Sequence, residues 1–172
     1  WILPLLKSYS YSIIIDDQHF YSEILVVSLI AVSLLFCENN LKSNFIGIMC
    51  YNKDLCDCFK EMIAKILSMF NDSLQFELNW DKLLQFRNVL TIFSDVDSDQ
   101  QYDYLIVSFC NSNTVSVRDA MVSVLKPKLA LYLVGNESMR RKNPFFDDLI
   151  KEIQGFQKIP AFNEEIDLHL FK

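Results

Sequence analysis

Short apolar runs alternate along this chain with segments in which apolar residues recur at a helical spacing. Residues 24–27, 45–49, 89–93, 102–108 and 129–134 form runs with the length of buried strands. The segments between several of these runs place apolar side chains three and four positions apart, which is typical of helices that bury one face. The pattern therefore predicts repeated βαβ units, a mainly parallel sheet and an α/β fold with helices on both faces.

The helical segments are predicted from the same spacing. A helix is expected to begin near Asn52 and to end at the turn-forming residues 71–73, and others are expected over residues 116–125 and 145–153. Residues 166–171 alternate apolar and polar positions, which predicts a final strand. Residues 1–23 are expected to form an N-terminal extension with helical character. The chain contains no repeat and no linker rich in proline or glycine, so we expect one domain over residues 1–172.

Charge and composition narrow the classes of partner. Half of the residues are apolar (51%) and 22% are charged, which is ordinary for a globular domain. The net charge of -6 disfavours non-specific attraction to nucleic acid, so a nucleic-acid partner is not expected. The densest basic run, residues 139–142, is interpreted as a solvated loop before Pro144.

The cysteines and the longest apolar run bear on location. The five cysteines are odd in number, which fits free thiols in a reducing compartment better than a disulfide framework. We therefore expect an intracellular, cytoplasmic location. Residues 24–37 are apolar, but a run of 14 is short of the roughly 20 residues that a spanning helix needs, so no membrane segment is expected. No metal site is expected, because Cys56 and Cys58 have the wrong spacing on a helix for a zinc pair.

Three segments together resemble the class I S-adenosylmethionine (AdoMet) methyltransferases. Residues 124–134 resemble the family's Leu-Lys-Pro-Gly-Gly step into its fifth strand, with Lys128 and Leu129 at the positions of the glycines. Residues 102–107 resemble its fourth strand, and residues 149–159 resemble its closing helix and Gly-Phe turn. The resemblance covers residues 20–172. It implies a doubly wound, Rossmann-like sheet with an antiparallel C-terminal strand, and AdoMet as the cofactor of an active member.

The resemblance also assigns cofactor positions, most of which carry unsuitable side chains. The family's glycine-rich loop after the first strand would fall on Ser28, Ile30 and Val32, whose side chains fill space that AdoMet needs. The acidic residue that binds the ribose would fall on Met49, a thioether that accepts hydrogen bonds weakly. Residues 74–78 alternate apolar and polar positions and are expected to form the family's third strand, which Asn79 or Asp81 would follow. The resemblance therefore implies a degenerate cofactor site, with no cofactor expected unless the chain is active.

Polar residues after the fourth predicted strand are the remaining candidates for catalysis. Ser108 and Asn111 occupy the place where active family members orient the methyl acceptor. An alternative interpretation makes the polar residues that follow, Asn113 and Thr114, helix N-caps. Neither interpretation identifies an acceptor.

Three functions follow from these observations. The leading hypothesis is a methyltransferase-like domain without catalysis that serves as a binding or scaffolding subunit for another protein. The first alternative is an active AdoMet-dependent methyltransferase with an atypical cofactor loop. The second is a domain similar to the phosphocysteine carriers of sugar-transport regulators, in which Cys50, at the end of a strand, would accept phosphate. Its loop, residues 51–54, has one lysine and no glycine to surround an anion.

Overall fold

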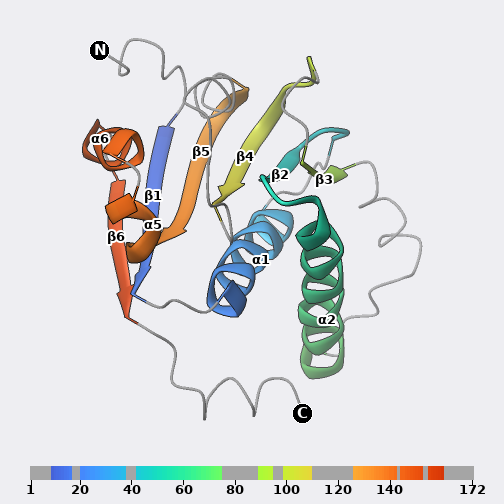
Figure 1. Cartoon of the computed structure of the whole chain (residues 1–172). Helices are drawn as coiled ribbons and strands as arrows, with labels where there is room; N and C mark the ends of the chain where they lie inside the picture. The colour runs from blue at the N-terminus through green and yellow to red at the C-terminus, as the bar shows by residue number, and fades with distance from the viewer. Residues whose placement is uncertain are drawn as a thin grey trace.

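The computed structural model describes residues 9–16, 20–37, 42–74, 89–94, 99–109, 126–142, 144–152 and 155–160 as an α/β fold built on one parallel sheet (Figure 1). The strands are β1 (Tyr9–Asp16), β2 (Ile46–Cys50), β3 (Leu90–Phe93), β4 (Tyr102–Ser108), β5 (Pro127–Asn136) and β6 (Gly155–Pro160). The helices are α1 (Phe20–Cys37), α2 (Cys56–Leu74), α5 (Glu137–Lys142) and α6 (Pro144–Glu152), and a single 3-10 turn, η2 (Lys53–Leu55), precedes α2.

The six strands lie in the order β3-β2-β4-β5-β1-β6, and every neighbouring pair is parallel. The first strand of the chain is therefore not central: β1 lies between β5 and β6. The connections that leave β2 and β4 run in opposite directions, toward β3 at one edge and toward β5 on the other side. This reversal makes the carboxyl ends of β2 and β4 a topological switch point, the usual ligand position in sheets of this kind.

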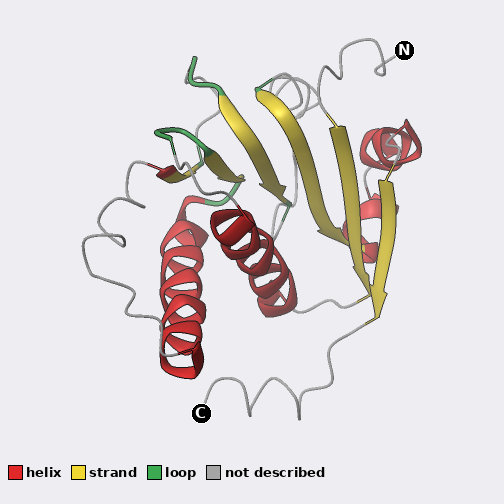
Figure 2. Ribbon diagram, turned by 180° about the vertical axis from the view of Figure 1, so that it is seen from behind, coloured by secondary structure: helices red, strands yellow, loops and turns green. Residues whose placement is uncertain are grey.

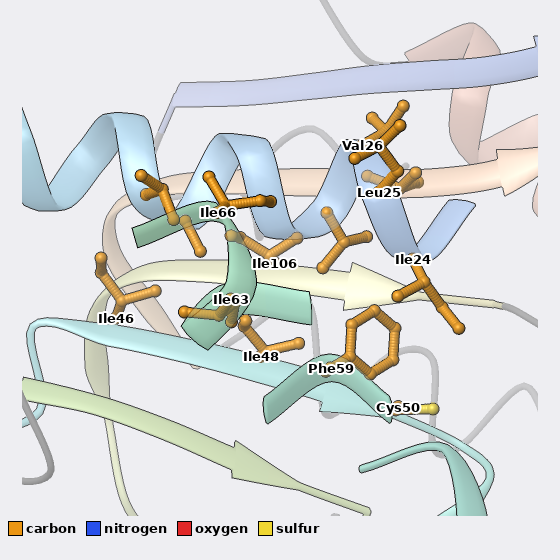
Figure 3. Close-up of a cluster of buried hydrophobic side chains, with 14 of the residues drawn as sticks. Ile24, Leu25, Val26, Ile46, Ile48, Cys50, Phe59, Ile63, Ile66 and Ile106 are labelled. Carbon is orange, nitrogen blue, oxygen red and sulfur yellow. The ribbon is translucent and has the colours of Figure 1, made fainter. Parts of the chain in front are cut away.

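Two apolar clusters lie on opposite faces of the sheet, because alternate residues of each strand point to opposite sides. The first cluster joins α1 and α2 to Ile15, Ile48 and Ile106, and Figure 3 shows its side chains, with Phe59 and Ile63 of α2 facing the sheet. The second cluster lies on the other face of the sheet. It joins Phe146, Leu149 and Ile150 of α6 to the strand residues that point to that face, among them Ile14, Met49, Leu105 and Leu131. We call the two sides the α1/α2 face and the α6 face.

The sequence predicts the middle of the chain well. The strands expected at residues 45–49, 89–93, 102–108 and 129–134 are confirmed as β2, β3, β4 and β5, and the helices α2 and α6 are also confirmed. The α2 helix continues to Leu74, so the turn expected at residues 71–73 is wrong, and so is the start of the strand expected at residues 74–78, whose other residues lie outside the described residues. The expected helix over 116–125 and the expected strand over 166–171 lie outside the described residues.

The N-terminal quarter of the chain corrects two predictions. The strand expected at residues 24–27 is wrong, because these residues belong to α1. The β-branched residues there favour a strand by propensity, but the apolar run is 14 residues long and strands usually have 4–8. The extension expected over residues 1–23 is also wrong in part, because it contains β1, a strand hydrogen-bonded on both sides.

The end of the described chain adds a strand. Gly155–Pro160 form β6, which pairs parallel to β1 from Tyr11 to Asp16, whereas the resemblance placed a turn at Gly155. Figure 2 shows this edge of the sheet from behind, with β6 farthest from β3. Every strand pair in the described sheet is parallel. The antiparallel strand expected over residues 166–171 lies outside the described residues.

Candidate functional site

The switch point brings together side chains from three elements. Cys50 is the last residue of β2 and lies directly opposite Ser108, the last residue of β4. The first turn of α1 adds Glu23, the acidic residue of that turn. All three side chains lie on the α1/α2 face, so this edge is where a ligand of the sheet is sought first.

A hydrogen bond joins α1 to β4 at this point. The Ser108 hydroxyl donates to Glu23 Oε1 at 2.8 Å, and both residues are at most 1% exposed. A carboxyl group is costly to bury without hydrogen bonds, and the N-terminus of a helix is a favourable place for it because the helix dipole is positive there. The pair therefore fills the switch point with the chain's own polar groups.

Cys50 is a buried thiol rather than an exposed nucleophile. Its side chain is fully buried, and its Sγ donates to the carbonyl oxygen of Asn52 at 3.2 Å. The pKa of Cys50 is raised to about 12, mainly by burial and to a smaller extent by the neighbouring Cys56 and Glu23. Because the thiolate is the reactive form of cysteine, this thiol is a poor nucleophile near neutral pH.

The polar groups of the loop after Cys50 form hydrogen bonds within the loop. The Asn52 side chain accepts a hydrogen bond from the Asp54 amide at 3.0 Å, and the Asn52 carbonyl accepts one from the Leu55 amide at 3.1 Å. These two amides lead into η2 and α2, where a phosphate loop would point its N–H groups at an anion. Here Asn52 caps the start of the helical segment instead.

The cofactor positions assigned by the resemblance do not gather at one place. Ser28 and Val32 lie in the middle of α1 and are buried, and Ile30 lies on the same helix at the edge of the first cluster. The assignment of these three residues to a loop after a strand is therefore wrong. Met49 is buried on the α6 face, on the opposite side of the sheet from Ser108 and Glu23. Asn79, Asp81 and Asn111 lie outside the described residues.

No pattern in the sequence predicted a role for Glu23. Ser108 was named for its place after the fourth strand, but no motif pointed to its partner 85 positions earlier. The available signal was a single acidic residue at the start of an apolar helix, a place where the helix dipole stabilises an acidic side chain.

The basic run at residues 139–142 belongs to helix α5, so the loop expected there is wrong. Arg140 Nε lies 2.5 Å from Asp147 Oδ1 on α6, and its guanidinium also lies 3.8 Å from Glu137. Arg141 lies 3.7 Å from the same Glu137 carboxylate. Two of the basic side chains are thus paired with acids of α5 and α6, which makes this run a structural ion-pair network.

A groove of about 420 Å³ lies on the α1/α2 face, between α1 and the strands β1 and β5. We call it the α1 groove, and it is lined by Ile13, Val26, Leu29, Ile30, Ser33, Leu34, Cys37 and Tyr132. None of these residues carries a charge. Next to the groove, the ring of Tyr11 stacks on the ring of Tyr132 with centroids 5.2 Å apart, and Tyr11 is 42% exposed.

The exposed sides of α1 and α2 differ in chemistry. On α2 the exposed residues include the ion pair Asp57–Lys60 as well as Glu61 and Lys65, as expected of a solvated helix face. Over residues 21–37 of α1 the exposed side chains are Tyr21, Leu29, Ser33, Phe36 and Cys37, and the helix's one acidic residue is buried. A helix that is apolar on all sides is typical of one covered on all sides.

The described residues also bear on metal binding and on membrane insertion. Within the described ranges, no group of three or more histidine, cysteine, aspartate or glutamate side chains gathers to hold a metal ion. In the same ranges, no helix is long and apolar enough to cross a membrane. No protein-family model matches the chain, and no curated protein matches it with significant similarity.

Proposed function

We propose that this chain is a non-catalytic, methyltransferase-like domain that binds another protein through the α1 groove. The observation that carries the proposal is the uncharged exposed face of α1, where Leu29, which lines the groove, is 39% exposed and Phe36 is 49% exposed. Contiguous apolar surface on a folded domain is typical of a site of protein interaction. The polar face of α2, on the same side of the sheet, has the character of a surface that stays in water.

The methyltransferase-like part of the proposal is supported by the second half of the chain. The segments that resemble the family's fourth strand, fifth strand and closing helix coincide with β4, β5 and α6. The proposal includes a doubly wound sheet and an antiparallel strand over residues 166–171. It does not include a glycine-rich loop at residues 28–32, since that segment is helical.

The absence of catalysis is proposed from the switch point. Glu23, Ser108 and Cys50 are each at most 1% exposed, so the position that a cofactor would take in a sheet of this kind is occupied by side chains. An active AdoMet-dependent methyltransferase would need these groups to move. A phosphocysteine carrier would need Cys50 as a thiolate, whereas burial raises its pKa to about 12.

The proposal is tested by affinity capture from the source cells with three immobilised forms of the chain. Leu34→Asp places a charge in the α1 groove, and Met69→Asp makes the same change on α2, at a residue 41% exposed outside the groove. We expect one protein to be retained by the parent and by Met69→Asp, and retained at least tenfold less by Leu34→Asp. Equal retention by all three forms, or by none, would contradict the proposal.

A further inference from the structure

We draw no further inference here: the strongest candidate, the apolar α1 groove between α1 and the strands β1 and β5, belongs to the site already proposed for protein binding, and nothing in the described part of the structure shows which segment covers it.

Discussion

Ser108 and Glu23 form a buried hydrogen bond of 2.8 Å between the end of β4 and the first turn of α1, although 85 positions separate them in the chain. The bond lies at the switch point of the sheet, where a ligand of such folds usually sits. It fixes the start of α1, the helix whose outer side forms the α1 groove. The region that would hold a cofactor is thus linked structurally to the helix that we propose as the binding surface.

Removing the donor of this bond should weaken the fold. In Ser108→Ala the Glu23 carboxyl group loses a hydrogen bond in a buried position, which should lower the free energy of unfolding by about 1–3 kcal/mol. Urea denaturation measures the change. Ser33→Ala, at an exposed serine on the same helix as Glu23, is the matched control and should change stability by less than about 0.5 kcal/mol. Equal effects of the two substitutions would show that the bond contributes nothing.

Gly47 is required by the position of Tyr102. A Cβ atom at Gly47 would lie 2.7 Å from Tyr102 Cγ and 2.8 Å from Cδ2, and the ring is held by stacking on Phe93 with centroids 5.2 Å apart. Gly47→Ala should therefore destabilise the fold by about 1–3 kcal/mol through overpacking. The same change made in Tyr102→Leu should cost measurably less, because the ring is gone. A double-mutant cycle by urea denaturation measures this coupling, and additive effects would contradict the explanation.

The raised pKa of Cys50 predicts slow alkylation. With a pKa of about 12, roughly one part in a thousand of this thiol is thiolate at pH 9, and burial also restricts access. Mass spectrometry after iodoacetamide treatment should find Cys37 labelled well before Cys50 in the native chain, and the two labelled at similar rates in guanidinium. Rapid labelling of native Cys50 would contradict its buried placement and would revive the phosphocysteine hypothesis.

The ion pairs of α5 and α6 predict a stability effect that depends on pH. Hydrogen bonds from Lys151 and Arg140 lower the pKa of Asp147 below its ordinary value. A lowered pKa means that the carboxylate stabilises the fold above its unfolded-state pKa of about 3.9, and that this stability is lost as the pH falls through the folded-state value. Asp147→Asn should therefore be less stable than the parent at pH 7 and similar to it near pH 2. High salt should also shrink the difference, because Lys151 is exposed and Asp147 is only partly buried. A difference in stability that persists at pH 2 would show that it does not come from the charge on Asp147.

The sequence predicted the elements whose pattern of apolar residues is compatible with only one type of secondary structure. The strands β2, β4 and β5 are short apolar runs bounded by polar residues, and α2 has a clear helical spacing with a polar outer face. The start of the chain was not predictable from the same rules. The α1 helix is apolar on almost every side, so it lacks the polar positions that reveal a helical period. Its β-branched residues then favoured a strand.

The candidate site was less predictable than the fold, because it depends on long-range pairing. The sequence placed Ser108 at a strand end, but it gave no reason to connect that residue with Glu23. The strand order also decided which residues share an edge: β2 and β4 are neighbours, and β1 lies two strands beyond β4. Without that order, the cofactor positions could be assigned only by resemblance, which placed Ser28, Ile30 and Val32 in a loop rather than in a helix.

The central claim, that the switch point holds no cofactor, is tested most directly by isothermal titration calorimetry. AdoMet and S-adenosylhomocysteine are titrated into the full chain, whose folding is checked by circular dichroism. Because Glu23, Ser108 and Cys50 fill this position, we predict no heat of binding for either compound. Micromolar binding, weakened by Ser108→Ala or by Glu23→Gln, would contradict the account and would support an active methyltransferase.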